Sequence, residues 1–197
     1  MGTTVPVAAQ SFPTANPIRV NSGTTQVTQS QNFVANSGPT RTALSASNNG
    51  GNTMAGSILV NVPIMATSTG ITQAGAINSA GSQGINLQPS ITLRDTTTVS
   101  ATGFLSNSDL ASTSVGAVGL NAQNSGRITG ETGVNVNITV ASNRPYGVYA
   151  NRQPNNNVFA DNGIINLSGT TNILTISQAN PDVANAANPN GARGLAA

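Results

Sequence analysis

The chain has 197 residues, of which 37% are hydrophobic and only 6% are charged, and its formal net charge is +2. An ordinary soluble domain carries roughly 25% charged residues, so the polar surface of this chain must come from Ser, Thr, Asn and Gln. The scattered Arg and the absence of Lys argue against a nucleic-acid partner, and the absence of Cys and His excludes disulfides, thiolate metal sites and the Ser-His-Asp and Cys-His catalytic devices.

The first part of the chain, residues 1–56, has the weakest pattern. Prolines interrupt it repeatedly, and the Gly- and Asn-rich stretch at 48–52 is typical of a turn or linker. We therefore expect two regions. Residues 1–56 are predicted to form an extended N-terminal segment that packs on a neighbouring copy, and residues 57–197 are predicted to form the folded body.

Strand signals strengthen from residue 57 onward. Short alternations of apolar and polar residues occur at 58–64, 91–94, 165–168 and 174–177, and the clearest occupies 134–140. A strict period of two is the signature of a strand with one buried face. We predict that four residues of that stretch point into a core (Val134, Val136, Ile138 and Val140) and that three point outward (Asn135, Asn137 and Thr139).

Two short phrases recur in the last part of the chain. One contains a glycine followed by an aliphatic residue, at 117–122, 145–150 and 192–197, and the other contains Asn, Gly and Ile, at 124–129 and 161–166. A glycine before an alternating stretch indicates a strand that is entered through a tight corner. The predicted turn glycines are Gly84, Gly119, Gly126, Gly147, Gly163 and Gly194, and we expect Gly119, Gly147 and Gly194 at equivalent corners.

The spacing of these phrases favours one fold class. Gly119 and Gly147 are 28 positions apart, whereas Gly147 and Gly194 are 47 apart. Propellers and leucine-rich repeats keep a tighter period, but a β-solenoid tolerates long excursions between coils. The predicted fold is all-β, a parallel β-solenoid or β-helix with long irregular loops, and the alternative is an elongated β-sandwich fibre subunit.

At these phrases, over about residues 70–197, the chain resembles the passenger domains of bacterial autotransporter adhesins. The units that carry the resemblance are 124–129 followed by 147–150, and 161–167 followed by 194–197. The resemblance implies a right-handed parallel β-helix, an extracellular location on the bacterial surface, and a role in adhesion or aggregation. The chain lacks the C-terminal barrel of that family, and we expect either a fragment or a subunit whose open end is covered by another copy.

Catalytic chemistry has few candidates in this sequence. The five acids are separated by more than four positions, and only Arg94 with Asp95, and Arg127 with Glu131, are close enough in sequence to contribute to a site. An exposed ion pair is the favoured explanation of each. We expect no enzyme activity, no cofactor and no metal. A carbohydrate-binding or carbohydrate-cleaving β-helix like that of a phage tailspike is the weaker alternative.

One aromatic and cationic cluster is a candidate surface-binding patch, formed by Arg144, Tyr146, Tyr149 and Arg152. The alternative, which is the commoner case, is that these side chains pack an exposed loop. The candidate ligands of this patch are host or cell-surface glycans, and no nucleic-acid partner is expected. No membrane-spanning segment is expected either, because no apolar run reaches the roughly 18 residues that a span requires.

The sequence thus predicts an extracellular structural or adhesive β-solenoid of the cell surface that self-associates. The alternative is the repeating subunit of a secreted extracellular filament. Low charge weakens the repulsion between copies, and a solenoid leaves unpaired backbone groups at its ends. We expect a homo-oligomer or a head-to-tail filament, with residues 1–56 against a neighbour and residues 190–197 in the junction.

Overall fold

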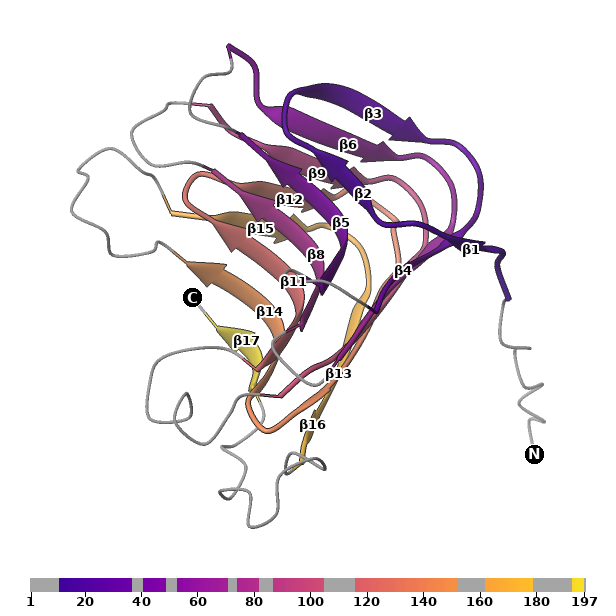
Figure 1. Ribbon diagram of the computed structural model, residues 1–197, viewed down its shortest axis with the longest axis vertical. Helices are drawn as coiled ribbons and strands as arrows, with labels where there is room; N and C mark the ends of the chain where they lie inside the picture. The colour runs from indigo at the N-terminus through magenta and orange to yellow at the C-terminus, as the bar shows by residue number, and fades with distance from the viewer. Residues whose placement is uncertain are drawn as a thin grey trace.

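The computed structural model describes residues 11–36, 41–48, 53–70, 74–81, 87–104, 116–151, 162–178 and 193–196, and every regular element among them is a β-strand. The strands form three parallel sheets, and each strand pairs with the strand three places later in the chain. One coil therefore contributes one strand to each sheet, and successive coils stack (Figure 1). This confirms the predicted all-β fold of the parallel solenoid type.

The first sheet contains β1 (Thr14–Ala15), β4 (Asn32–Ala35), β7 (Ile64–Thr69), β10 (Thr97–Thr102), β13 (Val136–Ser142) and β16 (Thr171–Ser177). The second sheet contains β2 (Ile18–Val20), β5 (Arg41–Ser47), β8 (Ala74–Ala80), β11 (Ala117–Gln123), β14 (Pro145–Asn151) and β17 (Arg193–Ala196). The third sheet contains β3 (Gly23–Val27), β6 (Gly56–Val60), β9 (Ser90–Leu93), β12 (Arg127–Gly130) and β15 (Ile164–Leu167).

The core consists of columns of like residues that run through the stack. In the third sheet Ile58, Ile91 and Ile128 lie directly above one another, and all three are fully buried. The second sheet carries a similar column from Leu44 through Val148, and the first sheet carries one from Phe33 through Ile138. Because the same register repeats in every coil, each inward side chain packs against its counterpart in the coil above and below.

The predicted orientation of residues 134–140 is confirmed. Val134, Val136, Ile138 and Val140 are buried, whereas Asn135 and Thr139 are exposed and Asn137 is half-buried. The amide nitrogen of Asn172 on β16 donates to Oδ1 of Asn137 at 2.9 Å, so the outward Asn side chains bridge adjacent coils.

The predicted boundary at residue 56 is corrected. Strands β1, β2 and β3 pair with β4, β5 and β6, so residues 14–35 and 41–47 supply coils of the same solenoid, and the boundary falls directly on β6. The reason is that β1, β2 and β3 are only two, three and five residues long, too short for a local period to stand out. Their stability comes from the neighbouring coil.

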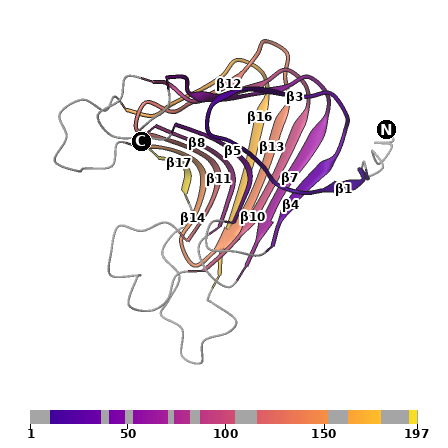
Figure 2. The ribbon, with the colours of Figure 1, turned by 45° about the horizontal axis from the view of Figure 1, so that its top comes forward.

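The second sheet is bent, and Figure 2 shows its strands curving toward the first sheet. In β11 the four consecutive residues 117–120 are all buried, so the alternation of inward and outward side chains is interrupted there. The recorded pairing of β11 with β8 and with β14 skips Gly119, as expected where a strand changes direction. Inward residues of the first sheet reach this bend, and a side chain there would collide with them.

Candidate functional site

The predicted turn glycines fall into two groups. Gly119, Gly147 and Gly194 do occupy equivalent positions, since the residues on both sides of each pair in register. They lie inside strands rather than at turns, however, and the described glycines with positive φ are Gly23 and Gly133. The surrounding space requires glycine at two of the three positions, because a Cβ on Gly119 would collide with Cγ2 of Ile138 and one on Gly147 would collide with Cγ2 of Ile173. At Gly194 the nearest atom to such a Cβ would be Cγ2 of Ile173 at an ordinary 4.0 Å.

Gly126 and Gly163 do lie at corners, directly before β12 and β15. A Cβ on Gly126 would lie 2.0 Å from the carbonyl oxygen of Ser79, and one on Gly163 would lie 2.0 Å from that of Ala122. Close backbone approach between coils therefore requires glycine at both places. Gly84 lies outside the described residues.

The two candidate acid–base pairs are not formed as the sequence suggested. The ion pair that the described residues contain joins Nε of Arg94 to Oε1 of Glu131 at 2.8 Å, and Nε of Arg127 donates to Oε1 of Gln88. Asp95 instead accepts a hydrogen bond from the backbone N–H of Thr96. Residues at equivalent positions of adjacent coils lie side by side, so the stacking of coils determines which side chains form ion pairs and hydrogen bonds.

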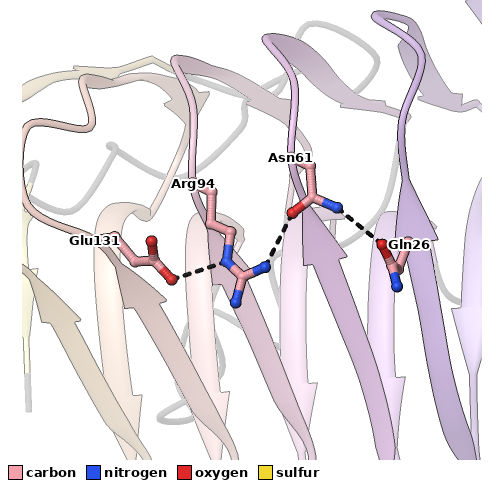
Figure 3. Close-up of polar contacts among 4 residues, drawn as sticks. All are labelled: Gln26, Asn61, Arg94 and Glu131. Carbon is pink, nitrogen blue, oxygen red and sulfur yellow. Dashed lines mark hydrogen bonds and ion pairs between the residues drawn. The ribbon is translucent and has the colours of Figure 1, made fainter.

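Figure 3 shows that this ion pair belongs to a polar row across four coils. An NH₂ group of Arg94 donates to Oδ1 of Asn61 at 3.2 Å, and Nδ2 of Asn61 donates to Oε1 of Gln26 at 3.2 Å. The side chains of Arg94 and Glu131 are 43% and 48% exposed. Water therefore competes for the hydrogen bonds of every side chain in the row. The row ties adjacent coils together and contains one acidic residue, Glu131. The row has no second carboxylate for acid–base work.

Replacing Arg94 with Ala is expected to lower the free energy of unfolding by about 1 kcal/mol or less, because exposed ion pairs contribute little and are screened by salt. Urea unfolding at low and at high salt checks this. A double-mutant cycle with Glu131→Ala isolates the pair, and a coupling above about 2 kcal/mol, unchanged by salt, would contradict this interpretation.

The predicted surface-binding patch is only partly a surface. The rings of Tyr146 and Tyr149 meet edge to face at 5.2 Å between centroids, but Tyr146 is buried while Tyr149 and Arg144 are half-buried. Arg152 lies outside the described residues. The hydroxyl of Tyr149 accepts a hydrogen bond from Nδ2 of Asn151 at 2.7 Å. The accessible part of the patch is therefore Tyr149 with Arg144.

The structure adds Arg193 to this cluster, because its guanidinium carbon lies 5.6 Å from the centroid of the Tyr146 ring, a cation–π distance. Sequence reasoning did not include it. The signal was nevertheless present, since aligning phrase 145–150 with phrase 192–197 places Arg193 opposite Tyr146, as the pairing of β14 with β17 does.

High pH is expected to destabilise the fold through Tyr149. Burial, and to a lesser degree the neighbouring Tyr146, raise the pKa of Tyr149 above its ordinary value, while the hydrogen bond from Asn151 opposes this shift. Above the ordinary pKa the unfolded chain loses the phenolic proton more readily than the folded chain, so stability falls as pH rises through that range. Thermal unfolding of wild type and Tyr149→Phe between pH 8 and pH 11 measures this; an equally steep fall in Tyr149→Phe would contradict it.

The last coil, made of β15, β16 and β17, carries a further feature that the sequence analysis did not single out. Of the five exposed large hydrophobic residues among the described ones, only Met54 lies elsewhere. The other four are on this coil, namely Ile164 at 43% exposure, Leu174 at 56%, Ile176 at 41% and Leu195 at 73%. These strands are also the terminal members of their sheets. An edge that is apolar and unpaired is a surface suited to association.

We searched the described part of the chain for metal-ligand clusters and for membrane-spanning helices. It contains no group of three or more His, Cys, Asp or Glu side chains placed to hold a metal ion. It also contains no helix long and apolar enough to cross a membrane. Comparisons with protein-family models, with curated proteins and with solved structures found no match to this chain.

Proposed function

We propose that this chain is a structural and adhesive β-solenoid of the bacterial cell surface, extracellular and without enzymatic activity, that self-associates. The observation that carries the proposal is the last coil, where four large apolar side chains are exposed on strands whose outer edge has no partner strand among the described residues. Natural sheet edges are commonly protected by charged residues, but among the described residues of this coil, 162–178 and 193–196, Arg193 is the one charged side chain. Burial of this edge would remove apolar surface from water at little electrostatic cost.

The rest of the described surface is consistent with a structural role rather than a catalytic one. Uncharged side chains join adjacent coils on the outer faces, as in the bonds of Ser57 with Ser90 and of Thr67 with Asn32. Such rows tie the stack together without presenting catalytic groups. The resemblance of 124–150 and 161–197 to autotransporter passengers favours the surface location, and Tyr149 with Arg144 is the candidate contact for cell-surface glycans.

Display of the chain on bacterial cells through a foreign anchor tests this function. Cells that carry the chain are expected to clump and settle, cells that carry the anchor alone are expected to stay dispersed, and excess purified chain is expected to compete with clumping. Dispersed cells at a surface density confirmed by antibody labelling would contradict the adhesive role.

The alternative function, a repeating subunit of a secreted filament, has a specific observation in its favour. Among the described residues, each of the three sheets ends on both sides of the stack in a strand with one edge unpaired, and all the strand pairings are parallel. Negative-stain microscopy separates the two functions. Long unbranched fibres of the purified chain would favour the filament, and short rods would favour the adhesive module.

A further inference from the structure

We propose that the last coil of one copy accepts the first coil of a second copy, so that each sheet continues across the junction in the register of its own coils. In this arrangement β16, β17 and β15 of one copy pair with β1, β2 and β3 of the next. The inference rests on the proposed self-association and specifies which edges meet and which residues face one another.

Strand direction determines which edges can meet. Every recorded pair in the three sheets is parallel, so translation of a whole copy along the stack presents each sheet with another parallel strand. The contact of two last coils would require one copy to be inverted, which makes the strands antiparallel. The contact that preserves the existing hydrogen-bonding pattern is last coil to first coil.

The inward columns match at the junction. Following the register through the second sheet, the column that begins at Ile18 ends at Leu195, so Ile18 of the next copy would cover the most exposed apolar residue of the last coil. The same procedure places Ala15 over Ile173 in the first sheet. In the third sheet it places Val27 over Leu167. All three sheets thus continue an apolar column, as the coils within one copy do.

The outward positions are compatible as well. Thr14 falls opposite Asn172, and Gln26 falls opposite Asn166, so polar side chains would meet polar ones at these two places, whereas Thr24 falls opposite the apolar Ile164. Arg19 falls opposite Ala196, so Arg193 and Arg19 are not in direct register. The junction therefore repeats the interior of the solenoid without placing like charges together.

Disulfide trapping tests this register without background, because the chain contains no cysteine. Paired strands lie about 4.8 Å apart, within the range of Cα separations that a disulfide spans. Four single variants at exposed or outward positions suffice, Thr14→Cys and Asn172→Cys in the first sheet, and Thr24→Cys and Ile164→Cys in the third, where Thr24 and Ile164 share a column.

Equimolar mixtures of two variants are oxidised and analysed on a non-reducing gel. The matched mixtures, Thr14→Cys with Asn172→Cys and Thr24→Cys with Ile164→Cys, are expected to give disulfide-linked dimers. The crossed mixtures, Thr14→Cys with Ile164→Cys and Thr24→Cys with Asn172→Cys, are expected to give far less, and so is each variant alone. Since every variant appears in one matched and one crossed mixture, differences in folding or thiol reactivity cancel.

Equal yields from matched and crossed mixtures would overturn the register, and dimers from single variants alone would overturn the direction. Sedimentation of the same samples separates this inference from the proposed function. Assembly without matched cross-links rejects the last-to-first contact and leaves self-association standing, whereas the absence of both assembly and cross-links rejects the two together.

Discussion

Replacement of Ile138 with Asp is expected to lower the free energy of unfolding by about 4 kcal/mol or more, a large part of the roughly 5–15 kcal/mol that stabilises an ordinary domain. Ile138 is 2% exposed, and its neighbours in register are Val99 and Ile173, neither of which offers a hydrogen bond. The carboxylate would have to be buried without a partner or to take up a proton, and both outcomes cost stability.

Urea unfolding followed by circular dichroism measures this loss. The matched control is Asn137→Asp, an isosteric change at the next residue of β13, whose carboxylate can still accept the hydrogen bond from Asn172. The control is expected to change stability by no more than about 0.5 kcal/mol. Equal effects at the two positions would show that residues 136–142 do not have one buried face.

Replacement of Gly119 with Ala is the second large effect, and we expect it to destabilise the fold by about 2–3 kcal/mol. The new Cβ would lie 2.4 Å from Cγ2 of Ile138 and 2.6 Å from the carbonyl oxygen of Gly147. The first atom belongs to a β-branched side chain and the second to the backbone of the next coil, so neither can move aside freely. The collision can be relieved only if the second sheet shifts away from the first.

Gly75→Ala provides the matched control, because Gly75 lies on β8 one coil away and a Cβ there would contact Cγ1 of Val118 at an ordinary 3.4 Å. Glycine weakens a strand relative to alanine, so this variant is expected to be neutral or slightly more stable. The midpoints of thermal unfolding of the two variants give the comparison. A Gly119→Ala protein as stable as Gly75→Ala would contradict the close approach of the two sheets.

The fold class could be predicted because the phrases repeat at irregular spacing, and the orientation of β13 could be predicted because it is a local property. Seven consecutive residues at 134–140 alternate without a break, and one sheet face buries every second residue. The strands at residues 14–35 could not be predicted in this way. Strands such as Thr14–Ala15 and Ile18–Val20 carry too few residues to show a period, and their strand character comes from pairing with β4 and β5.

The candidate site was less predictable because stacking brings together residues that are far apart in sequence. Arg94 pairs with Glu131, 37 positions away, rather than with the adjacent Asp95. The equivalence of Gly119 and Gly147 could be predicted from the repeated phrase, but their role could not, since it depends on Ile138 and on Ile173 from the opposite sheet. Repetition in a sequence reveals which residues share a column and does not reveal what faces that column.

Sedimentation velocity of the purified chain over a wide range of concentration tests the central claim, self-association of a structural solenoid, most directly. We expect species larger than the monomer whose proportion rises with concentration. We also expect a shift toward monomer in Leu195→Asp, which places a charge at the most exposed apolar position of the last coil. A single species with the mass of one 19.7 kDa chain at every concentration, identical in wild type and variant, would contradict it.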